Sequence, residues 1–392
     1  MSGRFAVVIV VDRWGAGFVG PYGNTWLDTP EACRLAAGAR LWETVLADSP
    51  DLSRAYRPLL AGRHARLAAT AAEPALPALV AREGLRSLLV TDEPAVATHP
   101  LAAGFGARCV VPNEPPNRAR ELDATALGRL FARAIDQLAA AREPGLVWIH
   151  SQGMAGPWDA PLDLRRQFAD EDDPEPPDLI EPPEMLLAEG FDPDLPLGCV
   201  QAYAGQVVLL DACLGNLLDA LDQHPRAGEM LVALTSPRGY PLGEHLRVGT
   251  CDQALYGELL HVPLIIRRPG ESHERMQPLR QTAELFWQVA DWLGLPVSRE
   301  PHPDNAAYSF APGQRSIRTP AWFLREVESA GETRRELFAK PDDRWEANEV
   351  ASRGGEVVEL LAQRLTTWEH AATAGNLAEL APLAEILADP WR

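Results

Sequence analysis

Lysine is almost absent from this chain of 392 residues. Lys340 is the only one, so nearly all of the 36 basic residues are arginines. Acidic residues outnumber them and give a formal net charge of −19. Because a surface of this charge repels phosphate groups, we expect neither a nucleic-acid partner nor an anionic membrane partner.

Cysteine is also scarce, and the five cysteines lie far apart in the sequence. The five cysteines are odd in number and contain no CxxC pair: Cys33, Cys109, Cys199, Cys213 and Cys251. Reduced thiols in a cytoplasmic protein are the simplest interpretation. The apolar run Phe5–Val11 is too short to span a membrane, and no small-residue cleavage site follows it. We therefore expect a buried first strand and a cytoplasmic location.

What the chain does contain is an alternation of short apolar runs and longer amphipathic stretches. Predicted strands lie at Phe5–Val11, Ser87–Thr91, Leu146–His150, Met230–Thr235 and Pro263–Ile266. Predicted helices lie at Thr29–Arg40, with Thr29 as the cap, at Arg118–Arg142 and at Gln201–Gln223. This order predicts an α/β fold with a mostly parallel central sheet flanked by helices.

Two segments depart from this pattern and suggest the domain organisation. Ala169–Pro196 is rich in Asp, Glu and Pro, and is expected to be a long surface loop. After an amphipathic helix that begins near Arg280, short strands are predicted at Ser316–Arg318, Trp322–Glu326 and Glu336–Ala339, followed by a helix at Gly355–Ala371. We therefore predict an α/β core over residues 1–300 and a small C-terminal subdomain, an antiparallel sheet plus a helix, over residues 301–392.

Polar residues follow several of the predicted strands, and the carboxyl ends of parallel strands are where ligands gather. The clusters are Asp12–Arg13, His150–Gln152, Ser236–Arg238 and Glu244–His245. All four are expected at one edge of the sheet.

Taken in order, these segments resemble the sulfatase family of the alkaline-phosphatase-like superfamily. "VVIVVDRWGAGFVGPYGNTWLDTPEACRLAA" is similar to the family's opening, and "SRAYRPLLAGR" to its nucleophile region, which includes Arg63. "LVWIHSQGMAGPWDAPLDLRRQF" resembles the middle motif, and "VALTSPRGYPLGEH" the late strand and loop. The resemblance covers nearly the whole chain and implies the α/β sulfatase fold.

The resemblance also implies a calcium or magnesium ion, which the family holds with two Asp after the first strand and an Asp with Asn or His in the late turn. Here Asp12 is the only retained candidate ligand, because Arg13, Pro237 and Arg238 stand at the other positions. Hard divalent cations need several oxygen ligands, so we expect no bound metal. The two arginines could instead bind an oxyanion such as sulfate or phosphate, or a sulfated ligand. Alternatively, an arginine pairs with Asp12 and fills the vacated ion site.

The family's nucleophile is a formylglycine made from Cys or Ser. Two alignments of the motif place either Leu52 or Pro50 at that position, and neither side chain can be converted. Ser49 and Ser53 carry hydroxyls, but a serine without an activating base or metal is a poor nucleophile. We therefore expect no cofactor.

The groups that the family brings to the sulfate are likewise changed. Its lysines are absent, and Ala155 or Gly156 replaces a histidine of the middle motif. His150 stands at a strand end, and His245 keeps the family's position. The vestigial pocket therefore comprises Asp12, Arg13, Ser53, Arg63, His150, Arg238 and His245.

Three functions are compatible with these residues. The first is a catalytically degenerate sulfatase-like protein that acts in binding or as a scaffold. The second is a sulfuric-ester or phosphoric-ester hydrolase that uses rearranged residues such as Ser53, His150 and His245 with the arginines. The third is a structural partner, for example of an intact paralogue.

Overall fold

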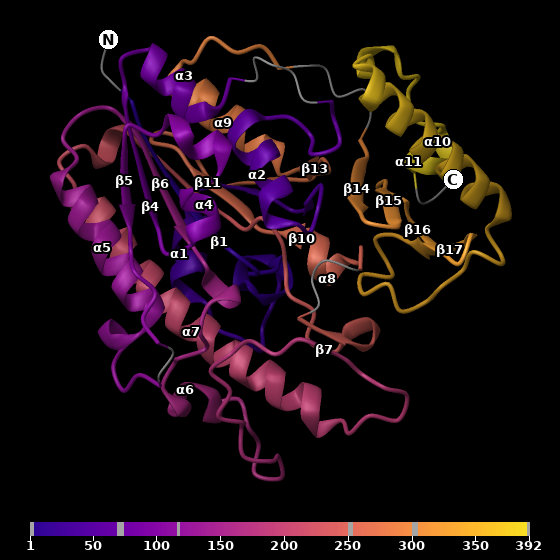
Figure 1. The fold of residues 1–392 in the computed structure, drawn as a ribbon, viewed down its shortest axis with the longest axis horizontal. Coiled ribbons are helices and arrows are strands. Elements are labelled where there is room, and N and C mark those ends of the chain that lie inside the picture. The colour runs from indigo at the N-terminus through magenta and orange to yellow at the C-terminus, as the bar shows by residue number, and fades with distance from the viewer. Residues whose placement is uncertain (1–3, 69–73, 116–117, 250–253, 300–304, 390–392) are drawn as a thin grey trace.

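The computed structural model describes residues 4–68, 74–115, 118–249, 254–299 and 305–389. It contains a large α/β core and a smaller C-terminal unit that lies beside it (Figure 1). This is the predicted fold class, with a mostly parallel central sheet and a small antiparallel sheet near the C-terminus.

Among the described residues, eight strands form the central sheet. In order across the sheet they are β12 (Glu274–Met276), β2 (Arg40–Trp42), β11 (Leu264–Arg267), β8 (Met230–Thr235), β1 (Phe5–Val11), β6 (Gly145–Ser151), β4 (Arg86–Thr91) and β5 (Ala107–Val110). Strands β8, β1, β6, β4 and β5 run parallel to one another, and β11 runs antiparallel to β8. The carboxyl ends of β8, β1, β6 and β4 therefore meet at one edge of the sheet.

Helices cover both faces of this sheet. The described α-helices are α1 (Pro30–Ala37), α2 (Leu52–Ala61), α3 (Leu76–Arg82), α4 (Pro94–Ala97), α5 (Ala126–Ala140), α6 (Leu162–Arg166), α7 (Asp194–Asp222), α8 (Gly257–Leu260), α9 (Ala283–Leu293), α10 (Gly355–Ala374) and α11 (Glu385–Ala388). Because side chains alternate along a strand, Val7 and Ile9 of β1 pack on the side of α5 and α7. Val8 and Val10 pack with α2, α3 and α9.

The predicted starts of two helices were wrong, whereas α1 starts at Pro30 as predicted. Helix α7 starts at Asp194, inside the stretch predicted as a loop, and α5 starts only at Ala126, where the Thr125 hydroxyl accepts a hydrogen bond from Gly128 N at 2.9 Å. Thr29 does not cap α1, because its hydroxyl accepts from Gly20 N at 2.8 Å. The carboxylate of Asp211 accepts from the amides of Glu31 and Ala32 instead, at 2.9 Å each.

Helix α7 is long and apolar enough to cross a membrane by length and composition, but most of it is buried inside the protein. It is the central helix of one core layer, in contact with α1, α5 and α6. Before it, residues 169–193 are largely irregular, as expected, apart from β7 (Met185–Leu186), which pairs with β9 (Arg247–Val248).

The C-terminal unit has a four-stranded antiparallel sheet and its own hydrophobic core. Its strands are β14 (Ala307–Ala311), β15 (Gln314–Arg318), β16 (Trp322–Ser329) and β17 (Glu332–Ala339). Helix α10 packs on this sheet through Leu361, Leu365 and Trp368. Strand β14 was missed, and the predicted boundary at residues 300 and 301 lies outside the described residues. A three-stranded sheet joins this region to the core: β10 (His261–Val262), β3 (Val45–Leu46) and β13 (Arg280–Gln281).

Four of the five cysteines lie among the described residues, and all four carry free thiols. They are Cys33, Cys109, Cys199 and Cys213. Cys251 lies outside the described residues. The expected reduced state therefore agrees with the geometry of the four that are described.

Candidate functional site

The carboxyl edge of the parallel strands brings together the polar residues that follow them. Asp12 follows β1, and its amide donates to the carbonyl of Ser151 at the end of β6, at 3.0 Å. The register places His150 beside both Val10 and Thr91. Arg238 follows β8 and reaches Asp12 from the other side. The sequence-predicted clusters around Asp12, His150 and Arg238 therefore share one edge.

The structure adds two acidic residues that the sequence reasoning missed. Asp92 and Glu93 follow β4, and the carboxylate of Asp92 accepts from Gln152 N at 2.8 Å. Burial raises the pKa of Asp92 to about 7. Asp12 was selected because it directly follows a predicted strand. Asp92 directly follows the predicted strand Ser87–Thr91, so the same rule also points to it.

Arg238 and Asp12 form a buried, bidentate ion pair. The Nε atom of Arg238 donates to Oδ1 of Asp12 at 3.0 Å, and its Nη2 atom donates to Oδ2 at 3.0 Å. The third nitrogen, Nη1, donates to the carbonyl of Pro50 at 2.7 Å. Burial alone would raise the pKa of Asp12, but the charge and hydrogen bonds of Arg238 outweigh it and hold that pKa below its usual value of 3.8. Asp12 is therefore an ionised carboxylate whose two oxygens both contact a guanidinium.

The turn after β8 holds Arg238 in this position. The hydroxyl of Ser236 donates to the carbonyl of Arg238 at 2.6 Å and accepts from the amide of Trp14 at 3.3 Å. Gly239 follows, and its amide donates to Leu259 at 2.8 Å. A Cβ on Gly239 would lie 2.1 Å from the carbonyl oxygen of Glu258, so only glycine fits there. The loop is thus packed to direct one arginine at Asp12.

Arg13 turns toward a different carboxylate. Its φ is 61°, and its two terminal nitrogens lie 3.3 and 3.4 Å from one oxygen of Glu184, in the acidic loop before α7. The hydroxyl of Tyr203 donates to the Arg13 carbonyl at 2.8 Å. Of the two arginines, Arg238 is the one that hydrogen-bonds Asp12. This arrangement favours the filled-site alternative, while oxyanion binding between Arg13 and Arg238 stays a prediction.

His150 is fully buried beside the ion pair. Its Nδ1 lies 2.6 Å from the hydroxyl of Tyr56 in α2, and its Nε2 has no hydrogen-bond partner among the described residues. Burial lowers the pKa of His150 to about 4, and burial likewise raises the pKa of Tyr56. His150 is therefore neutral at neutral pH and a weak base.

His245 lies in a separate set of contacts. Its Nδ1 lies 2.8 Å from Glu258, its Nε2 lies 3.0 Å from the carbonyl of Glu346, and its ring stacks on Tyr256 with centroids 3.5 Å apart. Burial alone would lower its pKa, but Glu258 outweighs burial and raises it. Both ring nitrogens bind protein groups, so His245 ties the loop after β8 to α8 and to the C-terminal unit.

The candidate nucleophile positions lie at the start of α2. Pro50 is buried and its carbonyl accepts from Arg238, whereas Leu52 is the first residue of α2. Both alignments of the formylglycine position stay predictions. The carboxylate of Asp51 caps the helix by accepting from Arg54 N at 2.8 Å. Ser49 is buried and accepts from the Asp51 amide at 3.3 Å, whereas Ser53 is exposed in the first turn of the helix.

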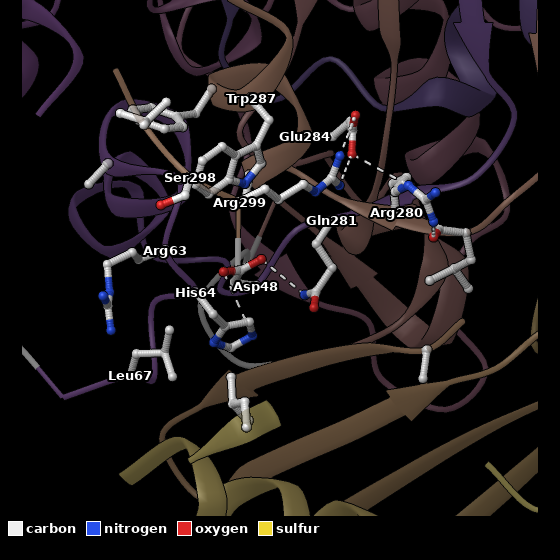
Figure 2. A pocket seen from close by; sticks show the side chains of 18 of the residues that line it. Asp48, Arg63, His64, Leu67, Arg280, Gln281, Glu284, Trp287, Ser298 and Arg299 are labelled. Carbon is white, nitrogen blue, oxygen red and sulfur yellow. Dashed lines mark hydrogen bonds and ion pairs between the residues drawn. The ribbon is translucent and has the colours of Figure 1, made fainter. Parts of the chain in front are cut away.

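Arg63 does not join this cluster. It follows Gly62, which ends α2. This helix has ten residues, so its two ends are separated by about 15 Å. Arg63 instead lines a cavity between α2, α9 and the C-terminal unit (Figure 2). The predicted vestigial pocket therefore divides into an Asp12 centre, the His245 contacts and the Arg63 cavity.

The residues present do not fit a divalent ion of the family's kind. Both oxygens of Asp12 accept from Arg238, and the neighbouring position is occupied by Arg13 rather than by a carboxylate. Among the described residues, no group of three or more His, Cys, Asp or Glu is arranged to hold a metal. A guanidinium also repels a cation at contact distance.

The comparisons with known proteins agree with this fold. A sulfatase family profile matches residues 4–295, about three quarters of the chain. Human iduronate 2-sulfatase is 33% identical over 120 residues, which are 30% of this chain and 18% of that protein. The multifunctional alkaline phosphatase superfamily protein PehA of Trinickia caryophylli is 26% identical over 95 residues, 24% of this chain and 18% of its own length. The matched segments thus span less than a fifth of either relative.

Solved structures match over a much larger share of both chains. The phosphonate monoester hydrolase of Agrobacterium radiobacter has a TM-score of 0.73 at 15% identity, with 94% of this chain and 96% of that one covered. A protein crystallised with its substrate D-glucosamine-2-N,6-O-disulfate has a TM-score of 0.75 at 13% identity, with 96% and 100% covered. At these identities the likeness shows a shared fold alone. The chain belongs to the sulfatase family, as its match to the family profile over residues 4–295 shows.

Proposed function

We propose that this protein is a member of the sulfatase family that binds ligands or partners without hydrolysing esters. The observation that supports the proposal is the contact of Arg238 with both oxygens of Asp12 and with the carbonyl of Pro50. Arg238 thus contacts both the one retained candidate metal ligand and Pro50, which is one of the two positions that the motif alignments offer for the nucleophile. A sulfatase reaction needs an activated nucleophile there, and this chain supplies an internal ion pair.

The alternative, hydrolysis by rearranged residues, receives no comparable support. Ser53 is exposed, His150 contacts Tyr56, and both nitrogens of His245 contact Glu258 and Glu346. General-base catalysis requires the base within hydrogen-bond reach of the nucleophile's proton. None of these contacts joins two of the three side chains.

The experiment that tests the proposal is a hydrolysis panel on the full chain. Aryl sulfates, phosphate monoesters and diesters, and phosphonate monoesters are each incubated with calcium, magnesium, manganese or a chelator. Rates at the level of the uncatalysed reaction are expected for every substrate. Turnover that is lost in Asp12→Asn would contradict the proposal and restore an enzymatic function.

A further inference from the structure

A cavity of about 740 Å³ opens where the end of α2, helix α9 and the C-terminal unit meet (Figure 2). Its lining reaches from Asp48, two residues before Pro50, to Arg63 beyond the end of α2. Neither Asp12 nor Arg238 lines it, so it is separate from the Asp12 centre. Its volume is within the range of sites that take drug-sized molecules. Three features of its lining indicate what it would bind.

The first feature is the backbone turn at Gly62, which forms part of the cavity wall. Gly62 ends α2 with φ of 64°, and a Cβ at this position would lie 2.3 Å from the ring of Phe286 in α9. Glycine is therefore needed both for the left-handed conformation and for the close approach of the ring. The turn directs the next two residues, Arg63 and His64, to the cavity wall.

The second feature is a polar floor whose side chains are held by hydrogen bonds to one another and to nearby backbone atoms. Asp48 accepts from Ala65 N at 2.9 Å and from Gln281 Nε2 at 3.0 Å. His64 donates from Nε2 to the carbonyl of Tyr308 at 2.8 Å and accepts at Nδ1 from Arg66 N at 3.0 Å. These two bonds fix a neutral ring, and burial lowers the pKa of His64 to about 4. The floor is thus pre-organised and carries the single negative charge of Asp48.

The third feature is an excess of arginine. Arg280 and Arg299 both contact the carboxylate of Glu284, so this trio has one formal positive charge. Figure 2 shows these two arginines on one side of the floor and Arg63 on the other. With Asp48 included, the charged side chains among the described residues of the wall are three arginines and two carboxylates.

An apolar wall faces these charges. Trp287 is half-buried, and its ring stands at 88° to that of Phe286, with centroids 4.9 Å apart. Leu67, Val297 and Trp368 continue the apolar lining. A flat apolar body can stack here, because aromatic rings bury a large area in a defined geometry.

We propose that this cavity binds an amphipathic organic monoanion, with a flat apolar body against Trp287 and its acidic group facing Arg299 and Arg280. Because the cavity is separate from the Asp12 centre, binding is expected whether or not that centre hydrolyses esters. Probe binding and ester hydrolysis are therefore measured independently. A negative result for probe binding does not affect the proposed function, and observed hydrolysis does not affect the proposed binding in the cavity.

The test uses two fluorescent probes that differ in one charged group. 1-Anilinonaphthalene-8-sulfonate and the uncharged N-phenyl-1-naphthylamine share the same rings, and their affinities for the full chain are measured by fluorescence titration. One charge-assisted hydrogen bond is worth about tenfold in affinity. The sulfonate is therefore expected to bind about tenfold more tightly than the uncharged probe, and Arg299→Gln is expected to remove that difference. Trp287→Ala should weaken both probes, and Ser298→Trp, at an exposed lining position, should obstruct entry.

Two control variants lie elsewhere on the surface. Arg86 is an exposed arginine paired with Glu143, and Trp345 is an exposed tryptophan that lines a second, smaller cavity. Arg86→Gln and Trp345→Ala are expected to bind both probes as the parent does, and thermal melts verify that every variant is folded. The proposal is wrong if folded Arg299→Gln, Trp287→Ala and Ser298→Trp bind the sulfonate as the parent does. It is also wrong if Trp345→Ala alone abolishes binding, or if the parent prefers the uncharged probe.

Discussion

Replacing Arg238 by glutamine removes the guanidinium from a buried pair and leaves Asp12 without its counter-charge. The side chains are 10% and 1% exposed, so water cannot readily solvate the remaining carboxylate. Removing one partner of such a pair costs about 3–5 kcal/mol. Whole domains are stable by only about 5–15 kcal/mol. Arg238→Gln is therefore expected to lower the free energy of unfolding substantially.

The pH dependence of the stability lost in Arg238→Gln tests whether the unpaired carboxylate of Asp12 causes that loss. In the parent, the pKa of Asp12 is below 3.8, so its contribution to stability is complete above that value and is lost only as the pH falls through the lowered pKa. Without Arg238, burial remains and raises this pKa above 3.8. Stability is then lost as the pH rises through the raised pKa. The cost of Arg238→Gln is therefore expected to be larger at about pH 8 than at about pH 5.

Urea unfolding followed by tryptophan fluorescence measures this cost at both values of pH. Asp12→Asn combined with Arg238→Gln gives the matched control, because the double variant keeps the polar contact without either charge. It is expected to be more stable than Arg238→Gln alone at the higher pH. The reasoning is refuted if Arg238→Gln lowers the free energy of unfolding by less than about 0.5 kcal/mol, or if the decrease does not change with pH. In either case the buried ion pair would not stabilise the carboxyl edge of the parallel strands.

The remaining predictions concern titration and covalent chemistry. Burial lowers the pKa of His150 from 6.5 to about 4, so the folded state binds fewer protons than the unfolded state between these values, and thermal stability should fall as the pH is lowered from about 6.5 to about 4. His150→Gln should reduce that slope. Burial raises the pKa of Asp92 from 3.8 to about 7, so Asp92→Asn should raise the melting temperature at about pH 8, with a gain that shrinks as the pH is lowered toward 4. Peptide mapping of residues 47–63 should show only the encoded side chains; a formylglycine there would contradict the account of Pro50 and Leu52.

Much of the fold could be predicted because its strands are fully buried. Strands such as β1 and β8 read as continuous apolar runs and needed no tertiary information. The capping group expected for α1 was wrong because a distant residue supplies the cap. Asp211 in α7 accepts from the amides of this helix, and that contact depends on packing that a local pattern cannot show. Strand β14 was missed because it pairs with β15 only once the C-terminal unit has formed.

The candidate site was predictable in kind but not in arrangement. The strand-end rule found Asp12, His150 and Arg238, yet it could not show that Arg13 would turn toward Glu184. The strand-end rule also could not show that Arg63 lies far from the Asp12 centre. Arg63 belongs to the same sequence motif as the start of α2, but the length of this helix separates the two ends of the motif. The carboxylate of Asp92 was within reach of the same rule and was overlooked.

The central claim is that Arg238 holds the place at Asp12 where a metal-dependent relative would need a cation. Metal analysis of the full chain, purified with calcium and magnesium present and then dialysed, tests this claim most directly. We predict no stoichiometric divalent ion in the parent. About one tightly held ion per chain, lost in Asp12→Asn, would contradict the account.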